Sequence, residues 1–285
     1  MTKALINKNM LTWARERAVM DIPTFANKMN VDEDRLVSWE DGVESITFVK
    51  AMEFAKKTHV PFGYLFLSEP PVEQLPIPDL RTVDGKGVGK PSAELFDLIK
   101  LMLDRQEWYR DYLLSNLARP VICVGRATLQ DSVDDVVRDI KQILDVPTYP
   151  TRGKWDDYYR ELVGKIERIG VSVMRQPYIG HHTRPLNVDE FRGFALCDDY
   201  APMIFINHAD APGPRLFTLI HELCHIWLNK PGISDGDPSN NRDEEKFCNA
   251  VAVHVSDESE HSFRFNPITH FGLNRSPVSV LSDHF

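Results

Sequence analysis

Apolar residues near the N-terminus recur at spacings of three and four, which is the period of a helix that buries one face. Leu11, Ala14 and Ala18 show this spacing, and short breaks rich in Asp, Asn, Pro or Gly interrupt it. Asp32 is expected to cap the third helix, and Gly42 to turn the chain after that helix ends. The predicted helices span residues 8–19, 22–29, 32–39, 47–58 and 62–66. Together they predict an all-α N-terminal domain over residues 1–68.

A segment rich in Pro and Gly follows, in which neither the helical nor the alternating period is seen. Pro76-Ile77-Pro78 favours extended backbone, and the glycines of residues 84–89 favour a flexible one. The helical period returns over residues 92–117, where Ser92 is the expected N-cap, and over residues 131–144. Residues 69–150 are therefore predicted to form a linker and a helical connector.

The second half of the chain mixes helical periods with short apolar runs. A helix predicted at residues 155–169 is followed by runs of strand length at residues 171–174, 194–197 and 203–207. Of two further helices, one begins near Pro212 and ends near Pro231-Gly232, and the other spans residues 242–255. The predicted fold class is α+β, with a mixed domain over residues 151–255 and an irregular tail over residues 256–285.

The helix after Pro212 carries a pair of histidines, in His221-Glu222-Leu223-Cys224-His225. Histidines four residues apart lie one turn apart on one face of a helix, where both imidazoles can reach one tetrahedral zinc. Glu222 lies on the flank of that face and can accept a proton from a zinc-bound water. Leu216, Leu219 and Ile220 belong to the opposite side, so one side is expected to pack on the core and the other to be free for chemistry.

A third protein ligand is needed, because a catalytic zinc keeps its fourth position for water. Glu245 on the next helix is the best candidate, since it shares a helical stripe with the small residues Cys248 and Asn249. The alternative for a lone glutamate is a solvated surface charge, and Glu244 points toward a less favourable face. Cys224 and Cys248 are soft enough to bind zinc, but we interpret both as small buried packing residues.

The strand before the metal helix is a candidate surface for substrate. A peptide adds as an extra strand beside such an edge in zinc peptidases of this build, so Phe205 or Asn207 could line the cleft. The alternative is an internal core strand. The group that stabilises the oxyanion is not identified; the candidates are His181, His182, Tyr200, His208 and Arg215.

The amino-acid composition limits the classes of protein to which this chain can belong. The chain has 285 residues, 42% hydrophobic and 26% charged, as is typical of a globular protein, and its net charge of −9 does not favour a polyanionic partner. It contains no run of about 18 apolar residues, so no membrane segment is expected. The four cysteines form no CxxC pair, which favours reduced thiols and a cytoplasmic location.

Several segments strongly resemble the ImmA/IrrE family of metallo-endopeptidases. They are Arg192-Gly193-Phe194-Ala195-Leu196, Ala201-Pro202-Met203-Ile204-Phe205-Ile206-Asn207, Phe217-Thr218-Leu219-Ile220-His221-Glu222-Leu223-Cys224-His225 and Glu245-Lys246-Phe247-Cys248-Asn249-Ala250. The N-terminal helices resemble the XRE-type helix-turn-helix domain that often precedes this peptidase, through Trp39-Glu40-Asp41-Gly42 and residues 59–67. The resemblance covers about residues 8–255 and stops after Val255.

This resemblance implies a zincin-like peptidase domain with a gluzincin-like site. His221, His225 and Glu245 would be its zinc ligands and Glu222 its catalytic base. The family also implies limited proteolysis of a partner, typically a transcriptional repressor or an antitoxin-like protein. The alternative function is a DNA-binding transcriptional regulator or sensor whose peptidase-like domain binds zinc without turnover. A third reading is a multidomain interaction protein that carries this motif by chance.

The helix-turn-helix resemblance makes residues 32–39 the recognition helix, whose first residues approach base edges. Those residues are Asp32-Glu33-Asp34, and only Arg35 and Ser38 suit contact with DNA. Residues 1–66 hold nine Lys and Arg against nine Asp and Glu, so this unit is neutral, whereas DNA affinity relies on basic residues. The alternative to a DNA-binding unit is a protein-docking module. Such a module would recognise a repressor of similar fold, or pair with a second copy of this chain as a homodimer.

Overall fold

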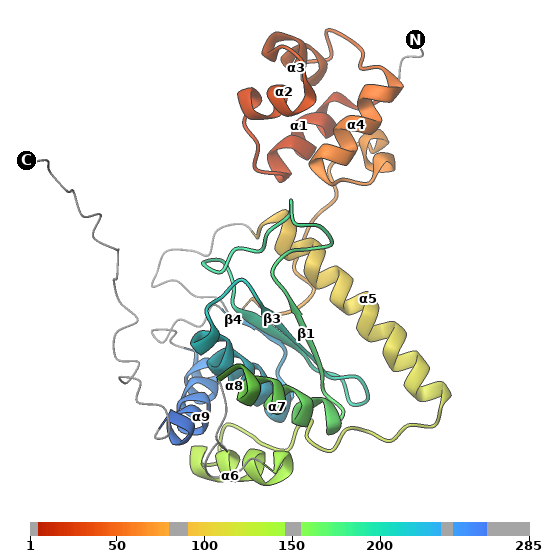
Figure 1. Cartoon of the computed structure of the whole chain (residues 1–285). Coiled ribbons are helices and arrows are strands. Elements are labelled where there is room, and N and C mark those ends of the chain that lie inside the picture. The colour runs from red at the N-terminus through yellow and green to blue at the C-terminus, as the bar shows by residue number, and fades with distance from the viewer. Residues whose placement is uncertain (1–4, 80–90, 146–154, 235–241, 261–285) are drawn as a thin grey trace, which may run out of the picture.

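The computed structural model describes residues 5–79, 91–145, 155–234 and 242–260 (Figure 1). The predicted flexible residues 84–89 and most of the predicted tail, residues 261–285, lie outside them. The helices are α1 (Lys8–Arg17), α2 (Ile22–Met29), α3 (Glu33–Glu40), α4 (Phe48–Thr58), η1 (Phe62–Phe66), α5 (Ala93–Ser115), α6 (Val133–Leu144), α7 (Trp155–Arg168), α8 (Pro212–Leu228) and α9 (Asp243–Glu260). The strands are β1 (Ser172–Gln176), β2 (Gly193–Leu196), β3 (Met203–Asn207) and β4 (Gly232–Ser234).

The N-terminal helices form a compact unit with its own core. Phe25 and Phe54 meet edge to face at 4.7 Å between ring centroids, and Leu36 and Trp39 of α3 pack against the same cluster. The five predicted helices are confirmed, although α1 ends earlier, where Val19 adopts a left-handed φ of 52°. Asp32 stands at the N-cap position of α3, but its side chain makes no capping hydrogen bond.

A four-stranded sheet in the order β1-β3-β2-β4 forms the centre of the second half. Strands β1 and β3 are parallel, whereas β2 is antiparallel to both β3 and β4. The three strands expected from the sequence are confirmed, and β4 is additional. Asn229 closes α8 in a left-handed conformation, so this helix ends before the predicted Pro231-Gly232 and leaves room for β4. Helix α9 continues past the predicted end at residue 255 to Glu260.

The sheet is covered on both faces, which makes the fold mixed α and β. Helices α7 and α8 lie against one face, with α9 packed on α8, and α5 lies against the other face (Figure 1). Alternate residues therefore enter different cores: Ala195 and Ile204 pack with α8, whereas Phe194 and Phe205 pack with α5. This two-sided burial explains why the strands are continuously apolar.

The prediction that residues 203–207 form an edge for substrate is wrong. Strand β3 is paired on both sides, with β1 and with β2, and its Phe205 and Asn207 are fully buried. Asn207 instead donates from Nδ2 to the carbonyl of Phe191 at 3.2 Å. The outer strands of the sheet are β1 and β4, so β3 offers no free edge to which a peptide could add.

The linker is attached to the outer side of β4. The amide of Ile233 donates to the carbonyl of Pro78 at 3.2 Å, and Asp79 forms an isolated parallel bridge with Ile233. Ile77 enters the core shared by α5 and the sheet. The extended backbone predicted from the prolines thus covers the outer edge of β4, which would otherwise be open to pairing with another strand.

Arg17 joins the N-terminal unit to the rest of the protein. Its guanidinium binds Glu73 of the linker at 2.7 Å and Asp97 of α5 at 2.6 Å. Asp97 also binds Arg184 at 2.6 Å, and Arg184 binds Glu94 at 3.2 Å. The side chain of Arg17 is only 7% exposed, so these ion pairs are poorly screened by solvent. Within the described ranges, no helix is long and apolar enough to cross a membrane.

Candidate metal centre

Helix α8 brings the two motif histidines together. Pro212 and Pro214 lie in its first turn, where the missing amide costs no hydrogen bond, and the apolar residues that follow drive it into the core. Four residues of separation place the Nε2 atoms of His221 and His225 3.1 Å apart. The Nδ1 of His225 donates to the carbonyl of Lys230 at 3.0 Å, which directs its Nε2 lone pair toward His221.

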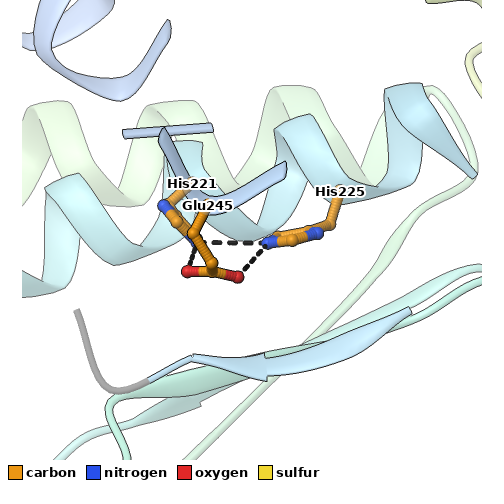
Figure 2. A group of neighbouring side chains, drawn as sticks. All are labelled: His221, His225 and Glu245. Carbon is orange, nitrogen blue, oxygen red and sulfur yellow. Dashed lines mark hydrogen bonds and ion pairs between the residues drawn. The ribbon is translucent and has the colours of Figure 1, made fainter. Parts of the chain in front are cut away.

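Helix α9 supplies Glu245 to the same point. One carboxylate oxygen lies 3.3 Å from Nε2 of His221 and the other 3.2 Å from Nε2 of His225. Figure 2 shows the three side chains turned toward one another, between α8 and the strands. The small buried residues Cys224 and Cys248 lie where the two helices meet and let them approach closely.

The expected open face of α8 is not found. His221 and His225 are 1% and 0% exposed, and every residue from position 218 to 228 is buried. The sheet covers one side of the helix, and α9 covers much of the rest. The imidazoles are therefore directed into an enclosed polar cluster rather than toward solvent.

Mutual charge stabilises this cluster. Burial raises the pKa of Glu245, but the hydrogen bonds and charges of His221 and His225 outweigh burial and lower it to about 2. Burial lowers the pKa of His221, and the hydrogen bond and charge of Glu245 overcome this and raise it to about 9. The pKa of His225 is lowered, chiefly by burial. The metal-free site thus behaves as an ion pair between Glu245 and protonated His221.

The three residues suit a divalent metal ion. Two imidazole nitrogens and a carboxylate oxygen lie within 4.8 Å of one another, and all three residues are buried. Ligand atoms about 2.0–2.1 Å from one tetrahedral ion are themselves roughly 3.3 Å apart. The separations of 3.1–3.3 Å match that spacing.

Glu222 lies beside this cluster without a strong partner of its own. It is fully buried, and neither carboxylate oxygen has a hydrogen bond in the part of the chain that is described. Burial is the main cause that raises its pKa to about 8. A Cβ atom on Gly193 of β2 would lie 3.0 Å from a Glu222 oxygen and 2.9 Å from the carbonyl of Phe205. Only glycine lets the carboxylate lie this close to the sheet.

Two neighbours of the site were missed from the sequence. Ser234 on β4 places its hydroxyl oxygen 3.1 Å from Nε2 of His221. Lys230 contributes its backbone carbonyl to His225, as described above. A backbone acceptor leaves no trace in residue type, and a three-residue strand is too short to show a period, so neither had a usable signal.

The other candidates are placed as follows. Glu244 pairs with Lys230 at 2.6 Å, so it is turned away from the histidines, as its helical position predicts. The rings of His181 and His182 lie 3.9 Å apart between centroids at an interplanar angle of 39°, and Arg215 contacts His208. The part of these residues and of Tyr200 in stabilising an oxyanion stays a prediction. Arg35 pairs with Glu44 at 3.1 Å, and Ser38 donates to the carbonyl of Arg35, so their proposed DNA contacts also stay a prediction.

Comparison with known proteins agrees with this geometry. Residues 167–256 match the family described as Peptidase_M78, IrrE N-terminal-like domain. No curated protein and no solved structure matches the chain. The matched residues include β1, the other three strands, α8 and most of α9, and so contain every member of the cluster. This segment is therefore similar to IrrE-type domains, and the chain carries a metallopeptidase-like domain with a buried His, His and Glu cluster.

Proposed function

We propose that the chain is a zinc-dependent endopeptidase. The observation that carries this proposal is the buried group of His221, His225 and Glu245 with Glu222 directly beside it. A structural metal site needs ligands alone, whereas a hydrolytic site also needs a base. The fully buried Glu222, with no competing hydrogen bond among the described residues, supports the hydrolytic alternative. No specific observation favours a regulator that binds zinc without turnover.

The chemistry follows from where these side chains stand. A bound zinc would supply an activated water and would polarise the substrate carbonyl. His221, His225 and Glu245 would hold the ion, and the Lys230 carbonyl would keep His225 in the correct tautomer. Glu222 would accept the proton of the attacking water and return it to the leaving amine. Burial raises the pKa of Glu222 to about 8 in the metal-free site, and the charge of a bound zinc would lower that pKa and favour the carboxylate that accepts the proton.

We further propose that the substrate is a regulatory protein, such as a repressor or an antitoxin, and that the N-terminal unit docks it. The neutral charge of residues 1–66 and the acidic start of α3 favour a protein over DNA as partner. Exposed apolar side chains on this unit, which are unusual on a surface without a partner, support the same choice: Phe48, Val49, Met52, Phe66 and Leu67. The four free cysteines support a cytoplasmic location.

Peptide cleavage is expected to depend on the metal. Protein stripped with a chelator should leave a peptide library intact, and the same protein reloaded with one zinc per chain should cleave it. Mass spectrometry of the library measures both, because new peptide termini report each cut. Equal cleavage by stripped and loaded protein would contradict the proposal, as would loaded protein that never cuts any member.

Metal binding is expected to release protons. His221 has a pKa of about 9 without metal and so carries a proton at pH 7, but only a neutral imidazole can bind an ion. At least one proton should leave per ion bound at pH 7, and affinity should rise as the pH increases toward about 9. Calorimetric titration with zinc in two buffers of different ionisation enthalpy measures this release. Identical heats in both buffers would show that His221 is already neutral.

A further inference from the structure

Strand β4 holds Ser234 in a fixed position next to the metal cluster. Ser234 pairs with Gly193 of β2, and its carbonyl accepts from the amide of Arg192 at 3.1 Å. On the other side of β4, the linker pairs with Ile233, whose side chain enters the core near α5. Because side chains alternate along a strand, Ser234 must face α8. It is 1% exposed, so its hydroxyl needs a partner within the protein rather than in solvent.

The nearest partner of that hydroxyl is a nitrogen that a metal would use. Its oxygen lies 3.1 Å from Nε2 of His221, the same atom that lies 3.1 Å from Nε2 of His225 and 3.3 Å from Glu245. Once Nε2 binds an ion, its lone pair is taken, so it cannot accept a hydrogen bond from Ser234. A buried hydroxyl left without an acceptor costs free energy, so with metal bound the Ser234 O–H needs an acceptor other than His221.

Glu222 offers that acceptor. Both of its oxygens are buried without a hydrogen bond among the residues described, so the carboxylate can accept from a new donor. The carboxylate also lies against Gly193, the residue that pairs with Ser234 across β2 and β4. A hydrogen bond from the Ser234 hydroxyl to Glu222 would satisfy a donor and an acceptor at once.

We infer that Ser234 is a positioning residue of the proposed peptidase, whose hydroxyl donates to Glu222 when metal is bound and holds the carboxylate beside the metal position. This inference rests on the proposed function. Ser234 acts through Glu222 rather than on the substrate. Its loss should therefore slow turnover while leaving substrate binding and metal stoichiometry unchanged.

Kinetics on the best-cleaved library peptide test this role. Ser234→Ala is expected to lower kcat about 10–100-fold, the usual effect of losing a group that orients a metal-site residue, with KM changed less than about twofold. Ser234→Thr keeps the hydroxyl and should restore most of kcat. Ser172→Ala is the matched control, because it makes the same change on β1, at the other edge of the sheet, and should behave as wild type. Wild-type kcat in Ser234→Ala, or a loss confined to KM, would overturn the inference.

Cobalt(II) loading gives a second measurement that does not depend on activity. Cysteine at position 234 would bring a thiolate beside the metal position, where a metal–sulfur bond of about 2.3 Å can form. Ser234→Cys should therefore show a thiolate-to-cobalt charge-transfer band that cobalt-loaded wild type lacks. A variant that binds one cobalt but shows no such band would refute the placement of Ser234. Wild type that binds no cobalt or zinc would instead refute the proposed function itself.

Discussion

Glu222→Gln protein is expected to bind zinc as wild type does and to cleave peptides about 100–10,000-fold more slowly. Glutamine keeps the shape of the side chain but cannot take a proton from the attacking water. Metal binding should persist because Glu222 is not among the three convergent residues, His221, His225 and Glu245. Measured kcat and zinc content of the same preparation separate chemistry from binding. Cleavage within threefold of wild type would remove Glu222 as the base.

Stability gives an independent control on this variant. An ionised Glu222 is disfavoured in the fold, because burial raises its pKa from the usual 4.5 to about 8. An acid whose pKa is raised by folding destabilises the protein as pH increases between those two values. Glutamine lacks this penalty, so metal-free Glu222→Gln should have a higher Tm than wild type at pH 7. A lower Tm would mean that lost activity reflects damage to the fold.

Glu245→Ala is expected to weaken zinc binding more than about 100-fold, whereas Glu244→Ala should leave it unchanged. Losing a group that merely supports a ligand already costs about 10–100-fold, and Glu245 contacts both histidines directly. Glu244 is the neighbouring residue of the same type, but it pairs with Lys230, at a site where solvent screens the charges. The two variants differ by one position and remove the same carboxylate group.

Competition with a chromogenic chelator measures both affinities. Equal affinities in the two variants would show that Glu245 is not a ligand. Loss of binding in Glu244→Ala alone would exchange the roles of the two glutamates. Because Glu245 also raises the pKa of His221, its removal should lower that pKa and reduce the proton release described above.

The local pattern of apolar residues predicted most of the helices and three strands. Each of these helices buries one face, and each of these strands contains a short apolar run. The same local logic placed His221 and His225 on one helix and selected Glu245 over Glu244, since helical geometry fixes which side chains share a stripe. It could not show that α8 is enclosed. Burial of a helix on all sides depends on which elements pack against it, and the local period of α8 does not show that both α9 and the sheet do so.

The position of β3 shows a second limit. An apolar strand of five residues reads the same whether it lies at an edge or inside a sheet covered on both faces. The deciding element was β4, which is too short to have a period and follows directly after the end of α8. Because the sequence did not reveal β4, it could not place Ser234 beside His221. For the same reason β3 was taken for an edge strand, although β4 lies at that edge of the sheet.

The pairing of the linker with β4 links the two ends of the proposed enzyme thermodynamically. Residues Pro78 and Asp79 border the strand that carries Ser234, and Glu73 of the same segment binds Arg17 of the N-terminal unit. A partner that shifts the linker on binding the N-terminal unit would change the affinity of the metal site. Reciprocity then requires metal or peptide at that site to change the affinity for the partner by the same factor. Recognition and cleavage would therefore share one free energy of coupling.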